Sequence, residues 1–362
     1  MQKEELRTSS IKYEDRPSFI KALLELVKSA ERDSKPLVVI DSIEAVENVV
    51  KAPLVEDLVK ISEELDLYLL LVSERADLSE SDFFVDGIIE LRRDISEGAT
   101  IRKAIIRKMR GVEIKQPEYL FTLRDGKFGI FPLFSFRAPE ETRLFEAIED
   151  PSERLFSSGS RELDEIFGGG FPKGSSILLE LSEGVTREMY YQIVSVFALN
   201  FLRNGRRVFA IHPLGVDREE IRENFIYPYV EEGERELLAD SWEELRDDFR
   251  GEIKRILTEG EFQEALHITG GDTLRSLFKE EVDEFLSLEN EVIKRNKGLA
   301  LRIAKHGFPL VREFSNLSDI HVKMENICNV PTIRGLRPKT QYYGMTLSFS
   351  EGYPQLGFTQ IE

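Results

Sequence analysis

The sequence predicts an α/β protein that has two domains with mostly parallel, twisted sheets. Short apolar segments such as PLVVIDS (36–42) and LYLLLVSE (67–74) are typical of buried parallel strands. They alternate with amphipathic helical segments, an order that places helices on the faces of a parallel sheet. A similar order of segments recurs in the second half of the chain, so we expect a degenerate tandem repeat rather than a short-period solenoid.

Length and charge limit the classes of protein that fit. The 362 residues suffice for two domains, each with its own hydrophobic core. The formal net charge of −18, from 67 acidic and 49 basic side chains, makes a nucleic-acid partner unlikely. The single cysteine, Cys328, excludes an intrachain disulfide, and no membrane-length apolar run or signal-peptide core occurs. We therefore expect a cytoplasmic protein without a membrane contact.

The first half predicts two helices and a series of strands. Residues 17–32, with Pro17 in the first turn, and residues 55–65 have the periodicity of amphipathic helices. The expected strands are 36–42, 67–74, 83–93, 100–111 and 119–131, the last a hairpin that turns at Asp125-Gly126. The later strands indicate an antiparallel edge beside a parallel sheet.

The second half repeats this plan after a polar segment. We expect strands at 176–180, 206–213, 264–270, 316–325 and 329–338, a helix at 188–203 and a long acidic helical stretch at 217–260. The proposed division is a partial domain at 1–137, a linker at 138–156 and a second domain at 157–362.

Thr269 takes the place in the second repeat that Asp41 has in the first. Fewer residues precede Asp41 than separate Gly184 from Thr269, so we expect the first domain to lack the strand and helix that surround Gly184 in the second.

The segment GSSILLELSEGVTREMYY (174–191) predicts a strand, a turn at Gly184 and a helix. This is the arrangement of a phosphate-binding loop, which needs glycine amides, a Lys for the β- and γ-phosphates and a Ser or Thr for magnesium. Here Thr186 stands at the last glycine position, Arg187 at the Lys position and Glu188 at the Ser/Thr position. Because Glu188 would oppose a triphosphate with a carboxylate, we expect a relic or weak nucleotide site.

These motifs resemble those of the RecA superfamily, specifically the archaeal KaiC-like branch that includes the gas-vesicle regulatory protein D. LFSSGSRELDEIFGGGFPKGSSILLE (155–180) is similar to the approach to that branch's P-loop, and VVIDSIEAV (38–46) to its Walker B strand. KMRG (108–111) is similar to its basic strand. The resemblance covers about 36–137 and 154–362, and it implies tandem RecA-like domains of the P-loop NTPase type, the first of them incomplete.

Asp41 and Ser42 end one predicted strand, and Ser73 and Glu74 end another, so all four lie at one sheet edge. Asp41 either coordinates nucleotide-bound magnesium or caps the next turn. Ser73 and Glu74 either respond to a bound nucleotide or are solvated strand ends. Glu44, which follows closely, is either a relic of a general base or a helix-start carboxylate.

Lys108 and Arg110 are two residues apart and share one face of a strand. The resemblance implies that they contact a neighbouring subunit, while the alternative is an edge strand that cations protect from aggregation. Arg334 and Arg337 are weaker counterparts in the second repeat. The four histidines have no metal-ligand spacing, so we expect no metal site.

These features favour a non-catalytic regulatory or scaffolding relative of KaiC-like ATPases, a pseudo-ATPase that acts through a protein partner or as a homo-oligomer. This reading involves no catalytic residue and no cofactor. The alternative is an ATP-binding protein or ATPase that uses Asp41, with ATP and magnesium bound at a P-loop from a longer product or a partner chain.

Overall fold

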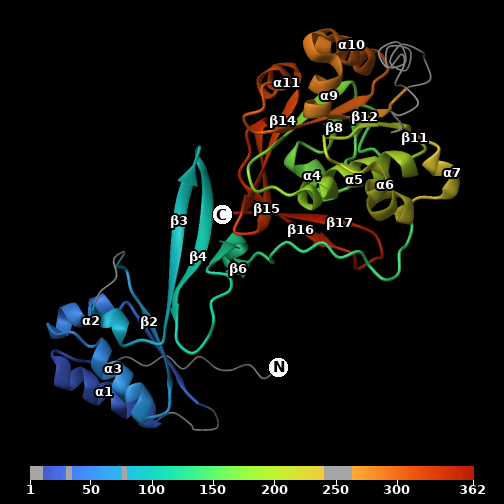
Figure 1. Ribbon diagram of the computed structural model, residues 1–362. Helices are drawn as coiled ribbons and strands as arrows, with labels where there is room; N and C mark the ends of the chain where they lie inside the picture. Colours follow the sequence, from blue (N-terminus) through green and yellow to red (C-terminus); the bar gives the residue numbers. More distant parts are fainter. Residues whose placement is uncertain (1–10, 30–34, 76–79, 240–262) are drawn as a thin grey trace. The chain divides into compact units, whose positions relative to one another are not determined.

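Figure 1 shows the computed structural model, in which residues 11–29, 35–75, 80–239 and 263–362 are described. The chain forms two compact units, one of residues 1–90 and 106–117 and one of residues 91–105 and 118–362. Both combine helices with strands, so the predicted α/β class is confirmed. The domain boundaries proposed from the repeat stay a prediction.

In the first unit, three helices pack on one face of a two-stranded parallel sheet. Strand β1 (Leu37–Asp41) pairs with β2 (Tyr68–Val72), and the helices are α1 (Arg16–Ser29), α2 (Ile43–Val50) and α3 (Val55–Glu64). Apolar residues of all three helices form a core around Ile40. Since side chains alternate along a strand, the neighbouring Val39 points away from this core and is exposed.

A four-stranded sheet has the order β3-β4-β5-β6. Its strands are β3 (Gly87–Ser96), β4 (Ala99–Met109), β5 (Glu118–Thr122) and β6 (Gly129–Ile130), and the short helix η1 (Glu80–Phe83) precedes them. β5 and β6 pair antiparallel around the turn η2 (Arg124–Gly126), where Asp125 and Gly126 both have positive φ. The hairpin predicted at Asp125-Gly126 is therefore confirmed.

The second unit contains a nine-stranded mixed sheet of order β11-β10-β12-β13-β9-β14-β15-β16-β17. Strands β11 to β14 in this order run parallel, and β15 to β17 continue antiparallel. Their bounds are β9 (Ser175–Leu181), β10 (Val208–Ile211), β11 (Leu238–Ala239), β12 (Leu266–Gly270), β13 (Leu299–Lys305), β14 (Ile320–Ile327), β15 (Val330–Arg337), β16 (Tyr343–Ser348) and β17 (Gln355–Gln360).

Helices cover both faces of this sheet (Figure 1). Helix α5 (Arg187–Arg203) is buried on all sides, and every residue from Met189 to Leu202 is buried. Ile177 and Leu179 of β9 pack in the same core as α5, whereas Leu178 packs in a second core. That second core is formed by α9 (Gly271–Phe278), α10 (Val282–Arg295) and α11 (Val311–Leu317), with the short η6 (Lys279–Glu281) between the first two.

Three consecutive glycines, residues 168–170, form a tight turn in which all three have positive φ. The turn follows α4 (Arg161–Ile166) and precedes β8 (Phe171–Pro172), which pairs with β7 (Leu155–Phe156). Gly170 has a φ of 135°, and an added Cβ would lie 2.6 Å from the Phe156 carbonyl oxygen. Only glycine fits this close approach, so packing alone accounts for it.

Several segments differ from what the sequence suggested, among them α2, which was not predicted. The long helical stretch expected at 217–260 is wrong for its described part; residues 240–262 lie outside the described residues. The described part contains only α6 (Arg218–Ile221), η3 (Arg222–Ile226), η4 (Tyr227–Tyr229) and α7 (Glu232–Arg235). Pro228 prevents a continuous helix there. In the expected linker, Phe145 is buried and its N–H donates to the Tyr229 carbonyl at 2.8 Å, so this segment packs on the second unit.

Buried His267 predicts a stability change in weak acid. Burial lowers its pKa from 6.5 to about 4, so between these values the unfolded chain binds the proton and the folded chain does not. Stability is unaffected above pH 6.5 and falls by up to about 3 kcal/mol as the pH drops to 4. Urea unfolding across this range should show the loss, and His267→Gln should reduce its slope. Equal slopes for both proteins would contradict this.

Candidate functional site

The carboxyl ends of β1 and β2 bring the predicted polar residues of the first unit to one edge. Asp41 pairs with Val72 in the parallel ladder, and Ser73 and Glu74 follow directly. Ser42 is the N-cap of α2, although its side chain makes no capping hydrogen bond. The Asp41 carboxylate is exposed and makes no hydrogen bond or ion pair with any described residue.

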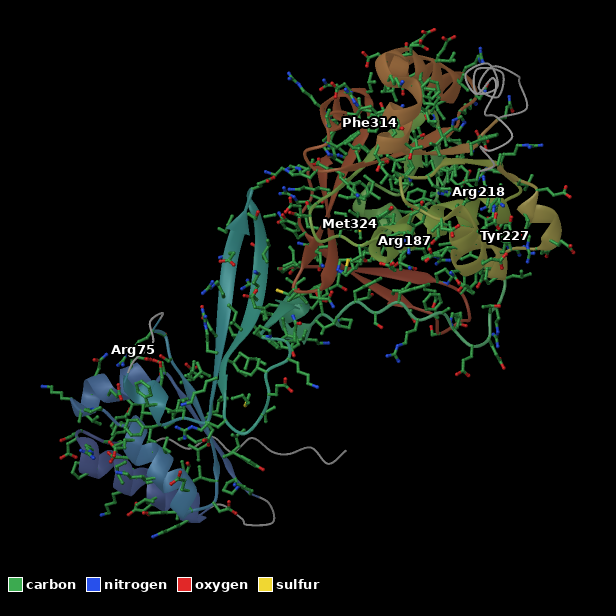
Figure 2. All side chains as sticks on the ribbon, viewed as in Figure 1. Arg75, Arg187, Arg218, Tyr227, Phe314 and Met324 are labelled. Atoms are coloured by element: carbon green, nitrogen blue, oxygen red, sulfur yellow. The ribbon has the colours of Figure 1, made fainter. Side chains whose placement is uncertain are left out.

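Glu44, in the first turn of α2, contacts the residues that follow β2. It accepts hydrogen bonds from the Ser73 hydroxyl at 2.5 Å and the Glu74 backbone N–H at 3.2 Å. Arg75 adds an ion pair, with 3.4 Å between its Nε and a Glu44 oxygen (Figure 2). Burial raises the pKa of Glu44, but these donors and the cation outweigh it and leave the pKa below its usual value. Sequence reasoning missed Arg75, a cation just after a strand end.

Lys108 and Arg110 contact backbone oxygens of their own unit. The Lys108 ammonium donates to the Asp82 carbonyl at 2.8 Å, and Arg110 donates to the Phe83 carbonyl and pairs with Asp86. These contacts fix the end of η1 beside β4. The inter-subunit role that the resemblance implied for both residues stays a prediction.

In the second unit, residues 182–186 connect β9 to α5 in the position of a phosphate-binding loop. The Ser182 N–H donates to the Met324 carbonyl at 2.9 Å, and the Val185 N–H donates to the Ser182 carbonyl at 3.3 Å. The Gly184 carbonyl accepts from the Asn326 side chain at 2.9 Å. Two of the loop's amides are therefore used within the protein, whereas a phosphate-binding loop directs them at the ligand.

Arg187 begins α5 and is paired with carboxylates on two sides (Figure 2). Its Nη2 lies 2.9 Å from Glu220 of α6 and 3.5 Å from Glu188. The pKa of Glu188 is lowered by its own backbone N–H, against the effect of burial, and also by Thr186 and Arg187. Arg187, which stands at the Lys position of a P-loop, is therefore ion-paired with two carboxylates. Glu188, which stands at the position of the magnesium-binding Ser or Thr, is itself a carboxylate.

A buried ion pair lies on β13, the strand beside β9. Arg302 of β13 and Glu289 of α10 are 0% and 1% exposed, and 2.8 Å separates their charged atoms. The Thr269 hydroxyl donates to Glu289 at 3.0 Å, and Arg302 also donates to Asn290 at 2.6 Å. Sequence reasoning missed this network, because its members come from three separate segments.

The structure corrects the equivalence between Thr269 and Asp41. In each unit a helix leads from one parallel strand to the next, α3 after β1 and α10 after β12. The Thr269 side chain points toward α10, because its hydroxyl hydrogen-bonds Glu289 of that helix. Asp41, by contrast, lies on the sheet face that points away from α3. Because side chains alternate along a strand, Gly270 corresponds to Asp41. The second unit therefore has Gly270, which is not a carboxylate, at the position that corresponds to Asp41.

Two histidines form hydrogen bonds with Glu180, which lies inside the apolar strand β9. His321 Nε2 lies 2.7 Å and His306 Nδ1 lies 2.5 Å from its two oxygens. The hydrogen bond from His321 is the largest of the effects that hold the pKa of Glu180 at about 2. The sequence signal was a carboxylate within a buried strand, which requires partners. Among the described residues, no group of three or more His, Cys, Asp or Glu has the arrangement of a metal site.

Comparisons with known proteins agree with this architecture. A family model described as "ATPase: KaiC" matches residues 2–133, and the degenerate loop lies outside that match. Protein GvpD2 of Halobacterium salinarum is 27% identical over 368 residues, which cover 92% of this chain and 70% of that protein. Protein GvpD1 of the same organism is 21% identical over 378 residues, with 83% and 69% covered.

The circadian clock oscillator protein KaiC of Acaryochloris marina is 34% identical over 125 residues, or 34% of this chain and 22% of that protein. The comparisons thus show a match to the KaiC-like ATPase family over residues 2–133, together with similarity to KaiC and GvpD proteins. The similarity to the two GvpD proteins extends over most of the chain. No helix in the described part of this KaiC-like chain has the length and apolar character needed to cross a membrane.

The buried ion pair predicts an asymmetric mutational response. Glu289→Gln leaves Arg302 charged and fully buried, so we expect a loss of about 3–5 kcal/mol in the free energy of unfolding. The double variant Glu289→Leu with Arg302→Leu removes both charges and should be more stable than the single variant. Urea unfolding measures both. A single variant within about 1 kcal/mol of the wild type would contradict the account.

Proposed function

We propose that the chain is a regulatory or scaffolding KaiC-like protein that acts through protein–protein contacts, with a pseudo-ATPase second repeat. The observation that carries the proposal is Arg187, whose guanidinium is held by Glu220 and Glu188 at the position where a P-loop requires a free Lys. The proposal includes tandem RecA-like domains and a cytoplasmic location. It requires no catalytic residue and no cofactor.

Charge and surface support a protein partner or further copies of the chain. The net charge of −18 opposes binding to a nucleic acid. In the first unit, the sheet face opposite the helices carries exposed apolar side chains; we call it the open face. It comprises Leu37, Val39, Tyr68, Leu70 and Val72. Contiguous apolar surface of this kind is typical of an interface.

The open face also favours the alternative function, an ATP-binding protein that combines Asp41 with a P-loop from another chain or a longer product. In the second unit, the face that corresponds to it by strand alternation packs in one core with α5, the helix after the loop. A strand, loop and helix of the same kind would cover Leu70, now 52% exposed, and would bring phosphate-binding amides to Asp41.

The pseudo-ATPase proposal predicts little or no ATP binding by the 362-residue chain, because two of the loop's amides are used within the protein and no Lys stands at the P-loop position. Titration calorimetry with ATP and magnesium should give a dissociation constant weaker than about 1 mM. The triple variant Thr186→Gly, Arg187→Lys, Glu188→Thr should gain affinity without hydrolysis, since Gly270 supplies no carboxylate. Arg187→Lys alone is the control. Micromolar binding at 182–189, or steady phosphate release by the triple variant, would refute the proposal.

The open face predicts self-association or a bound partner. Sedimentation at micromolar concentration should show a species larger than the monomer, and Leu70→Lys should shift it toward the monomer without lowering thermal stability. Leu214→Lys is a matched control, because Leu214 is 57% exposed in the second unit and lies outside the open face. A monomeric wild-type chain, or equal effects of both variants, would contradict self-association through this face.

A further inference from the structure

The turn between β3 and β4 carries a glutamate in an unfavourable conformation. Glu97 and Gly98 have φ values of 49° and 82°, so both central residues are left-handed. Such turns favour Asn, Asp or Gly at the first position, because a longer side chain pays a steric cost there. A residue stays in a disfavoured backbone conformation only when the surrounding contacts hold it there, so the contacts of the Glu97 side chain matter.

The Glu97 carboxylate reaches cations of the nine-stranded sheet, within the second unit. Arg334 of β15 donates a hydrogen bond to it, and the Lys323 ammonium of β14 lies 4.0 Å away. The hydrogen bond from Arg334 is the main cause that lowers the pKa of Glu97. A third cation is close, since a Cβ on Gly98 would lie 3.3 Å from the Lys339 ammonium.

Arg334 is a buried residue rather than a surface cation. The residue is 2% exposed, and its guanidinium lies 4.9 Å from the centre of the Tyr342 ring. Its Nε is buried and has no hydrogen-bond partner among the described residues. The nearest other acid, Glu325, is 3.9 Å from this Nε and is also held by the Tyr342 hydroxyl at 2.6 Å. Without Glu97, Arg334 would lack a close anionic partner.

We propose that Arg334 and Lys323 form a binding site for a phosphate-type oxyanion, and that the Glu97 carboxylate occupies this site from within the chain. A buried guanidinium with donors on Nη2 and Nε has the geometry that phosphate oxygens accept in pairs. The Glu97 side chain is 61% exposed, so a dissolved anion can reach and replace it. The site is separate from the loop at 182–186 and uses none of its residues.

The carboxylates around the site limit what it accepts. Glu325 ion-pairs with Lys323 at 3.4 Å, and the negative charge of Glu180 acts on Glu97 against its ionisation. Three cations, Lys323, Arg334 and Lys339, therefore outnumber the two retained carboxylates, Glu325 and the histidine-bonded Glu180, once Glu97 is withdrawn. This balance suits a compact, doubly charged anion such as inorganic phosphate.

Inorganic phosphate and the variant Glu97→Gln test the proposal. The variant keeps the size of the side chain but removes the competing charge, so phosphate should bind about tenfold more tightly than to the wild type in titration calorimetry at low salt. Glu118→Gln is the matched control, since Glu118 is a carboxylate paired with Lys103 in the same four-stranded sheet. The control removes the same charge and should leave phosphate affinity unchanged.

Adding Arg334→Met to Glu97→Gln should abolish the gained binding. Circular dichroism melting checks that this double variant is folded; if it is not, Lys323→Met in the Glu97→Gln background replaces it and should weaken binding. An affinity for phosphate that is the same in wild type and Glu97→Gln overturns the proposal, and so does an equal gain in Glu118→Gln. In the first case Glu97 only anchors the turn, and in the second the gain is a general effect of net charge.

Discussion

The burial of β9 between β13 and β14 constrains the whole second unit. All seven of its residues are buried, both neighbouring strands run parallel to it, and α5 packs on one of its faces. Because β9 is paired on both edges and covered on both faces, the loop that follows it can lie only at the carboxyl edge of the sheet. The loop at 182–186 is therefore positioned as in a nucleotide-binding protein, whatever its side chains are. Arg187, at the start of the helix after this loop, is paired with Glu220.

The first unit presents the opposite combination of features. Its strand-end carboxylate Asp41 has no partner among the described residues, while Glu44 holds Ser73 and the Glu74 backbone in place. Apolar side chains on its sheet are exposed where the second unit buries them against a helix. The first unit thus has a strand-end carboxylate beside exposed apolar side chains, and the second has a buried strand whose following loop ends at the paired Arg187. A protein that works through its surfaces is consistent with both.

Sequence periodicity predicted the positions of helices and strands better than it predicted which side chains share a face of the sheet. The apolar runs at 36–42 and 176–180 gave strands close to their observed bounds, and Asp125-Gly126 gave a hairpin. The equivalence of Thr269 with Asp41 failed by one residue, because an apolar strand buried on both faces has no alternation to fix its register. The pairing of Arg302 with Glu289 was beyond prediction, since it depends on which helix crosses β13.

Hydrogen–deuterium exchange of the wild-type chain tests the central claim most directly, that the loop after β9 is present but does not hold a triphosphate. Backbone amides of residues 182–189 would be followed with and without about 1 mM ATP and magnesium, a concentration that saturates any micromolar site. The account predicts unchanged exchange at these amides, since Arg187 stays paired with Glu220 and Glu188. Protection of the same amides by ATP would contradict it.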